Sequence, residues 1–354
     1  MFSCRMYRAA SRSLHYFAQR SATATLATPQ RPLILILRRN MAAAAAASSS
    51  SPIRVPGPVV SPSWLRSNYP SVTVLDGSWY MPNEHQDPAS NFSKAHLPGA
   101  RFFDLEACTS KEGSNADLPH MMPSAEQLSA YLSKLGIRSM DEAVVVYDGK
   151  GIFSAPRIRF TLRHFGLDNV AVLEGGIKAW VQEGGKTETG SVEAANPTVA
   201  APPLPLRARA GEIHTMSEVS LNSCSDAPTF QLVDARTAGR FNGTEPEPRP
   251  GLSSGHVAGA KNVPVMNLLR TDAASGATVF KPVPELSAAF RQAGVDPASP
   301  QRIVASCGSG VTACVVLLGL ELAGRKDNVG MYDGSWTEWA LRGNKIETNK
   351  STKE

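Results

Sequence analysis

An internal duplication constrains this chain more than any other feature, because short motifs recur in the same order about 160 residues apart. His96 and His256 each precede a Gly-Ala pair by three residues. The run VTVLDGSW around Asp76 resembles FQLVDART around Asp234, and both halves end on a similar Gly-rich segment before a tryptophan. Solenoid repeat units are only about 20–50 residues long. We therefore predict a duplicated domain, not a solenoid.

Each half alternates short apolar runs with helical patterns. The runs VTVLD, AVVVYD and VAVLEGG are β-branched and end in polar turns, whereas SAEQLSAYLSKLG has helical periodicity between a serine and a glycine. This alternation predicts an α/β fold in which each half is a parallel sheet flanked by helices. Ligands of such sheets lie beyond the carboxyl ends of the strands.

The chain of 354 residues is long for one domain and, at 42% hydrophobic residues, can bury two cores. A segment rich in Pro, Ala and Thr separates the halves and predicts an extended linker. We expect four parts: residues 1–57 as a transit peptide and disordered segment, 58–187 as an inactive domain, 188–211 as the linker, and 212–346 as the catalytic domain.

No aspartate or glutamate occurs before Asp76, whereas arginine and serine are frequent there. This composition is typical of an organelle transit peptide, with a disordered basic arm as the alternative. We expect the mitochondrial matrix, with the chloroplast as the alternative, or the cytosol if Met41 is the start. Nucleic-acid binding is not expected, because the positive charge lies in this segment. The run from Leu33 to Leu37 is too short to span a membrane, which needs about 20 apolar residues.

The chain has five cysteines at wide, irregular spacings: Cys4, Cys108, Cys224, Cys307 and Cys314. No Cys-x-x-Cys pair suggests a zinc site, and we expect no metal and no cofactor. A chain of this size does not need disulfides, which favours a reducing compartment.

Cys307 is the first residue after the predicted strand RIVAS, and the apolar helix VTACVVLLGLELAG follows it. Gly308, Ser309 and Gly310 turn the chain between them. We expect backbone N–H groups of this turn, and the positive end of the helix, to favour a thiolate and to hold an anionic persulfide. A packed cysteine beside a tight turn is the structural alternative. Cys314, deeper in the helix, is expected to be such a packed residue.

The first half has Asp148 where the second half has Cys307. A carboxylate cannot perform sulfur nucleophilic chemistry, so only the second half is expected to be catalytic. The first half is expected to shape the cleft.

Two tandem half-domains, a cysteine in the second half and the loop CGSGVTAC resemble the rhodanese superfamily, within it the branch that acts on 3-mercaptopyruvate. The resemblance extends from about Val59 to Asn344. It implies two rhodanese-like domains joined by an extended linker. It also implies a sulfurtransferase that moves sulfur from 3-mercaptopyruvate, and from thiosulfate, through a persulfide to a thiol or cyanide. Pyruvate is released, and acceptor thiols include thioredoxin.

The resemblance also implies roles for individual residues. Arg240 and Arg249 would hold the substrate carboxylate and carbonyl, together with the loop residues Gly308, Gly310, Val311 and Thr312. Ser309 would move protons through His120 and an acid at Glu106, where many relatives have aspartate. Arginine suits this clamp because its guanidinium binds carboxylates in a bidentate manner. For Arg236, a clamp role and a solvated charge both stay open.

Two other functions compete with this one. A cysteine-dependent phosphatase needs an arginine shortly after its cysteine to bind phosphate, and this loop has none. A persulfide carrier for a protein partner would not need the carboxylate clamp of Arg240 and Arg249. A thiosulfate-preferring enzyme would have basic residues after the cysteine, where Gly308 and Ser309 stand.

Overall fold

A computed structural model describes residues 53–349. The expected transit peptide therefore lies almost wholly outside the described residues. The first half contains these elements in chain order: β1 (Val59–Val60), α2 (Pro62–Asn68), β2 (Thr73–Asp76), η1 (Pro82–Glu84), α3 (Pro88–Lys94), β3 (Arg101–Phe102), η2 (Gly113–Asn115), α4 (Ala125–Lys134), β4 (Val144–Tyr147), α5 (Ala155–His164), β5 (Val170–Leu173) and α6 (Gly176–Gln182).

The short helix α7 (Val192–Ala195) lies between the halves. The second half contains β6 (Ile213–His214), α8 (Met216–Ser223), β7 (Phe230–Asp234), α9 (Ala238–Asn242), β8 (Lys261–Asn262), η3 (Val265–Asn267), β9 (Leu269–Thr271), β10 (Thr278–Phe280), α10 (Val283–Gln292), β11 (Arg302–Ser306), α11 (Ala313–Leu322), β12 (Val329–Tyr332) and α12 (Ser335–Leu341).

Each half forms a five-stranded sheet, and the two sheets have the same strand order. The first runs β1-β5-β4-β2-β3 and the second β6-β12-β11-β7-β8, with every neighbouring pair parallel. The predicted fold class, two tandem parallel sheets flanked by helices, is confirmed. An antiparallel hairpin of β9 and β10 is added in the second half. The exact boundaries of the two domains stay a prediction.

The linker is extended over most of its length but contains the one-turn helix α7. Ser191 caps this turn by accepting a hydrogen bond from the amide of Ala194, a local contact that the composition did not reveal. Further on, Leu204 and Leu206 are buried in the core, and Ser129 on α4 exchanges two hydrogen bonds with Leu204. The linker is thus packed along α4 and is not a free tether.

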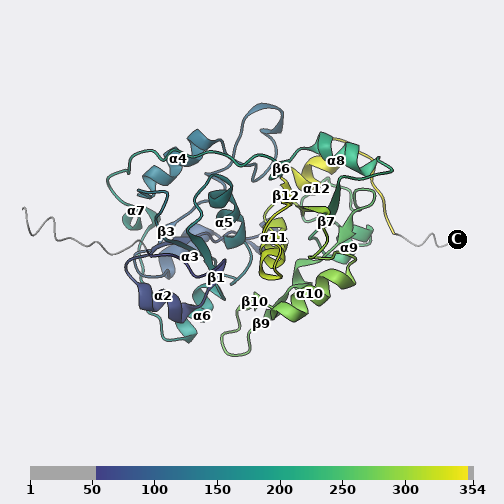
Figure 1. Cartoon of the computed structure of the whole chain (residues 1–354). Coiled ribbons are helices and arrows are strands. Elements are labelled where there is room, and N and C mark those ends of the chain that lie inside the picture. The colour runs from purple at the N-terminus through teal and green to yellow at the C-terminus, as the bar shows by residue number, and fades with distance from the viewer. Residues whose placement is uncertain (1–52, 350–354) are drawn as a thin grey trace, which may run out of the picture. The chain divides into compact units, whose positions relative to one another are not determined.

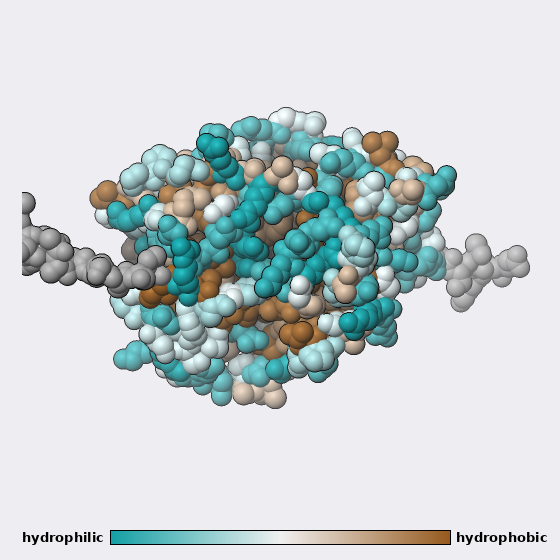
Figure 2. Space-filling view, in the orientation of Figure 1, coloured by the Kyte–Doolittle hydropathy of each residue, from teal (hydrophilic) through white to brown (hydrophobic). Residues whose placement is uncertain are grey.

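Helices α5 and α11 lie side by side between the sheets and pack against each other (Figure 1). One cluster of buried residues continues through them from the first sheet to the second. A face of the molecule is shown in Figure 2, where hydrophilic residues prevail and apolar ones form small groups. Within residues 53–349, no helix is long and apolar enough to cross a membrane.

Helix α11 is nearly all apolar because both of its sides are covered. Gly319 lies so close to α10 that a Cβ there would be 3.4 Å from the ring of Phe290, which is fully buried. This packing fixes the helix whose first turn follows Cys307.

We expect Phe290→Ala to lower the free energy of unfolding by about 3–5 kcal/mol, because it removes a buried ring and leaves a cavity beside α11. Leu221→Ala is the matched control: Leu221 is 75% exposed, so that change should stay within about 0.5 kcal/mol. Urea denaturation followed by circular dichroism measures both, and equal effects would contradict this account of the core.

Candidate active site

Cys307 directly follows β11, at the carboxyl end of the central strand of the second sheet, as the sequence predicted. Its amide donates to Ser335 Oγ at 3.2 Å, and its carbonyl accepts from the amide of Trp336 at 2.9 Å. The next carbonyl, of Gly308, accepts from both the amide and the hydroxyl of Thr337. The start of α12 therefore holds the loop at Cys307 and Gly308, and the amides of the loop after Cys307 make no hydrogen bond to α12.

The main-chain amides from Gly308 to Ala313 donate to no acceptor in the described part of the chain. None of them makes a hydrogen bond to Cys307 Sγ within that part either. The amides that were expected to surround the sulfur therefore do not hydrogen-bond to Sγ itself. The donors are nevertheless present and unpaired, because the tight turn keeps them out of the helix ladder of α11.

The first half shows what such a loop binds. Asp148 directly follows β4, the strand equivalent to β11. Its carboxylate accepts hydrogen bonds from five main-chain amides at 2.8–3.0 Å, those of Lys150, Gly151, Phe153, Ser154 and Ala155. The equivalent positions in the second half are Ser309, Gly310, Thr312, Ala313 and Cys314. All but the last have an unpaired amide there. The loop of Cys307 therefore offers its amides to an anion one bond beyond Sγ.

Ser309, His120 and Glu106 form a hydrogen-bonded chain across the two halves. Ser309 Oγ lies 2.9 Å from His120 Nδ1, and His120 Nε2 lies 2.7 Å from Glu106 Oε1. Trp79 Nε1 donates to the same carboxylate oxygen at 3.1 Å. The longer side chain of glutamate does reach the histidine.

Burial lowers the pKa of His120, and nearby Arg249 and Arg157 lower it further, against the opposing effect of Glu106. The hydrogen bond from His120 lowers the pKa of Glu106 to about 2, so its carboxylate is ionised at neutral pH. A neutral imidazole that donates from Nε2 to this carboxylate has its Nδ1 lone pair toward Ser309. The arrangement can accept a proton from the serine hydroxyl.

The residues of the expected clamp differ in their surroundings. Arg249 donates to Ser309 Oγ at 3.4 Å and has no acidic partner among residues 53–349. Arg240 is bound to Glu247, with a 2.6 Å contact from Nη2. Both guanidinium groups lie near the loop, since a Cβ at Gly308 would be 3.2 Å from Arg240 Nη2 and 3.7 Å from Arg249 Nη1.

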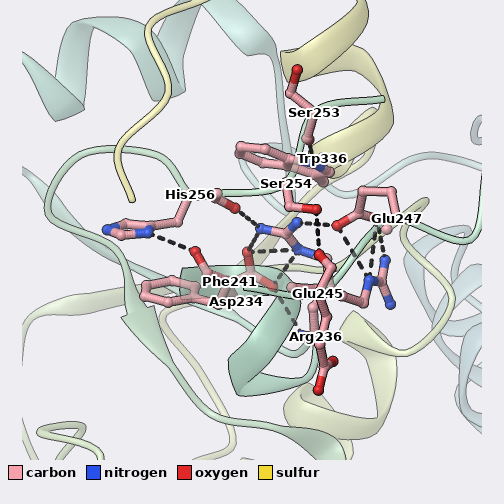
Figure 3. Close-up of polar contacts among 12 residues, drawn as sticks. Asp234, Arg236, Phe241, Glu245, Glu247, Ser253, Ser254, His256 and Trp336 are labelled. Carbon is pink, nitrogen blue, oxygen red and sulfur yellow. Dashed lines mark hydrogen bonds and ion pairs between the residues drawn. The ribbon is translucent and has the colours of Figure 1, made fainter. Parts of the chain in front are cut away.

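Arg236 is neither a free clamp residue nor a solvated charge. Its guanidinium is fully buried between Asp234, Glu247 and the carbonyl of Gly255, and it stacks 4.1 Å from the ring centre of Trp336 (Figure 3). This side chain is part of the scaffold that supports the clamp.

A cleft of about 500 Å³ opens between the halves at this site. The first half contributes Trp79, Met81 and Phe153, and the second half contributes the clamp and the catalytic loop. Thr312 faces the cleft, and its hydroxyl bonds to no residue that the structure describes. Val311 is buried against Trp79 and Leu105. Cys307 is only 2% exposed yet lines this cleft, so a reactant approaches it from there.

Arg157 on α5 was not identified from the sequence. It is buried, pairs with Asp333 at 3.0 Å, and donates to the carbonyls of His120 and Gly310. It thus holds His120, whose φ of 59° is unusual for a non-glycine residue, and the catalytic loop together. A comparison of the halves could have revealed it, because the equivalent position in the second half is Val316.

His96, His256 and Cys314 have structural surroundings, and for Cys314 this agrees with the prediction. His96 and His256 each bond to a carbonyl within their own half, at 2.9 Å and 2.8 Å, and stack on a phenylalanine. Cys314 is buried, and burial raises the pKa of its thiol to about 12. Such a thiol stays protonated at neutral pH, so Cys314 serves as a packing residue.

Comparisons with known proteins define the class. A model of the rhodanese-like domain matches residues 82–183 and 218–342. The mitochondrial thiosulfate/3-mercaptopyruvate sulfurtransferase 1 of Arabidopsis thaliana is 40% identical over 303 residues, covering 80% of this chain and 76% of the relative. The 3-mercaptopyruvate sulfurtransferase of Homo sapiens is 37% identical over 271 residues, covering 76% and 85%. The thiosulfate sulfurtransferase of Rattus norvegicus is 40% identical over 294 residues, covering 80% and 92%.

Solved structures agree. Tum1 of Saccharomyces cerevisiae is 30% identical with a TM-score of 0.73, over 83% of this chain and 98% of that one. SseA of Escherichia coli, titled a 3-mercaptopyruvate sulfotransferase with the rhodanese fold, is 34% identical with a TM-score of 0.67, over 79% and 98%. The chain belongs to the rhodanese family. It is a sulfurtransferase of the tandem-domain form.

We expect Arg157→Met to lower the free energy of unfolding by about 3–5 kcal/mol, because it leaves the carboxylate of Asp333 buried without its cation. Adding Asp333→Asn should recover part of that loss, since no unpaired charge then remains. Urea denaturation of the single and double variants measures the difference. Equal free energies of unfolding for the single and the double variant would contradict the stabilising role given to the Arg157–Asp333 ion pair.

Proposed function

We propose that the chain moves sulfane sulfur from 3-mercaptopyruvate, and from thiosulfate, through a persulfide on Cys307 to a thiol or cyanide. The observation that carries this proposal is the set of unpaired amides around Cys307, equivalent to those that bind Asp148. In aspartate the oxygens stand two bonds beyond Cβ. In a cysteine persulfide, the outer sulfur stands two bonds beyond Cβ as well. The names of the relatives support the two donors.

The reaction proceeds in two steps. The Cys307 thiolate attacks the sulfur of 3-mercaptopyruvate, the C–S bond breaks, and its electron pair leaves on the enolate of pyruvate. Ser309 takes the proton of the substrate thiol while its own proton passes to His120. Glu106 stabilises the imidazolium, which returns the proton through Ser309 to the enolate carbon. An acceptor thiolate or cyanide then attacks the outer sulfur and regenerates the Cys307 thiolate.

The clamp supports a carboxylate donor. Arg249, without an acidic partner in residues 53–349, and Arg240 flank the loop, where they can hold the carboxylate and the carbonyl of the substrate. A carrier without turnover would not require them. A thiosulfate-preferring enzyme stays the alternative, and the neutral residues Gly308 and Ser309 argue against it.

Thioredoxin is a proposed protein acceptor, since it presents a reactive thiol. We propose the mitochondrial matrix as the location, supported by the Arg-rich, acid-free start of the chain and by a relative named mitochondrial. The chloroplast, or the cytosol for a product that begins at Met41, are the other outcomes. A reporter fused to the first 57 residues distinguishes them.

Incubation with 3-mercaptopyruvate and cyanide should release pyruvate and thiocyanate, and intact-mass spectrometry should find one added sulfur atom when the acceptor is withheld. Cys307→Ser should abolish all three signals. Cys314→Ser is the matched control, because a serine hydroxyl can keep the contact with the carbonyl of Gly310. Wild-type protein that releases no pyruvate would refute the proposed donor.

Glu106→Gln should move the titration midpoint of the His120 ring to lower pH, because the hydrogen bond and the charge of Glu106 favour the imidazolium. Removing them deepens the lowering that burial causes. The rate of pyruvate release should fall by about tenfold or more, because no carboxylate then stabilises the protonated ring of His120. NMR of the histidine ring and a pyruvate assay measure the two effects. The exposed Glu126 provides the control variant Glu126→Gln; an unmoved midpoint in Glu106→Gln would exclude the relay.

A further inference from the structure

Glu247 is the buried acid beneath the substrate clamp. Its side chain is only 2% exposed. One oxygen accepts from Arg236 Nη1 at 2.7 Å (Figure 3). The other accepts from Arg240 Nη2 at 2.6 Å. One carboxylate thus joins the scaffold arginine to the clamp arginine.

Arg236 cannot follow Glu247 if the acid moves, because it is anchored on three other sides. Asp234 binds it through both carboxylate oxygens, the carbonyl of Gly255 accepts a further hydrogen bond, and Trp336 covers its face. Glu247 is therefore held on a rigid base, and its position is set before any substrate arrives.

Glu247 in turn orients Arg240. It occupies the Nε and Nη2 edge of the guanidinium, with distances of 3.2 and 3.1 Å from Nε. Arg240 Nη1 has no hydrogen-bond partner in the described part of the chain. Arg240 Nη2, which has a second hydrogen besides the one that Glu247 accepts, lies beside the loop, 3.2 Å from where a Cβ at Gly308 would stand. A second carboxylate can therefore bind Arg240 end-on while Glu247 keeps its side.

Glu247 also sets the charge of the site. Asp234 and Glu247 carry two negative charges against the two positive charges of Arg236 and Arg240, so these four side chains cancel. Lys150 at the edge of the cleft is paired with Glu84. Of the cations around the loop, Arg249 is left without an acidic partner in residues 53–349. Among the side chains that solvent screens least, the clamp thus has an excess of one positive charge; Glu245 also lines the cleft but is exposed to solvent.

We propose that Glu247 is a positioning residue that aims Arg240 at the donor and limits the clamp to one unbalanced positive charge, so that the cleft selects a singly charged donor over a doubly charged one. This inference rests on the proposed function. The 3-mercaptopyruvate carboxylate, with its thiol protonated, carries one negative charge, whereas thiosulfate carries two. A buried pair is weakly screened, so one unit of charge there discriminates between them.

The test compares the two donors in one protein. Glu247→Gln keeps the shape and removes the charge, and should raise kcat/KM for thiosulfate relative to that for 3-mercaptopyruvate on the order of tenfold. Glu247→Asp keeps the charge but shortens the reach, so both KM values should rise while the ratio stays the same. Glu285→Gln makes the same charge change at the exposed start of α10, outside the cleft, where solvent screens it, and should alter the ratio by less than about twofold.

Arg240→Gln changes the charge in the opposite sense and should lower the same ratio, which keeps the inference testable if Glu247→Gln does not fold. Competitive inhibition by pyruvate and by sulfate provides a measurement of anion binding that needs no turnover of the variant with its poorer donor. A ratio that neither variant moves, in protein that is folded and active, would overturn the role of Glu247. Wild-type protein inactive with both donors would instead remove the proposed function.

Discussion

A single buried guanidinium connects the two halves of this molecule at the candidate active site. Arg157 belongs to the first half, but it contacts Asp333, the carbonyl of Gly310 in the catalytic loop, and the carbonyl of His120. Breaking such a buried pair from one side leaves an uncompensated charge, which is costly in a medium of low polarity. Ser309 of one half and His120 of the other are therefore kept in register by this buried ion pair and its hydrogen bonds.

The equivalent loops of the two halves have the same backbone position but differ in what their amides contact. Both loops follow the central strand of a parallel sheet and expose a series of amides. In the first half these amides are filled by the carboxylate of Asp148, and in the second half they are open. The first half then supplies His120, Glu106 and one wall of the cleft. The two loops thus differ in whether the side chain at the end of the strand occupies the amides of its own loop.

The sequence predicted the features that repeat or that follow local rules. The strand before Cys307, the turn of small residues and the contrast with Asp148 could all be read from periodicity and from the alignment of the halves. The structure also brings Ser309, His120 and Glu106 together, a grouping that came from family resemblance. Their catalytic roles remain proposals.

The missed residues act across long distances in the chain. Arg157 and Asp333 are separated by most of the second half, and Glu247 lies in a loop without periodicity, so no local pattern indicates their partners. The turn α7 was missed because a single serine cap stabilises it. Thr312, which the resemblance gives as a substrate-holding residue, lines the cleft, and its hydroxyl bonds to no described residue. Tertiary contacts decide the partners of Arg157 and Glu247, whereas α7 depends on a local cap, and composition reveals neither.

The open amides of the second loop have an energetic consequence. Buried donors without acceptors destabilise a fold, and an anion that satisfies them stabilises the state in which it is bound. On the proposed cycle, an anionic persulfide bound to these amides favours the loaded enzyme over the enzyme that has delivered its sulfur. The hydrogen bonds of the loop then favour sulfur uptake. The acceptor has to remove the sulfur from these hydrogen bonds, so they oppose the second step.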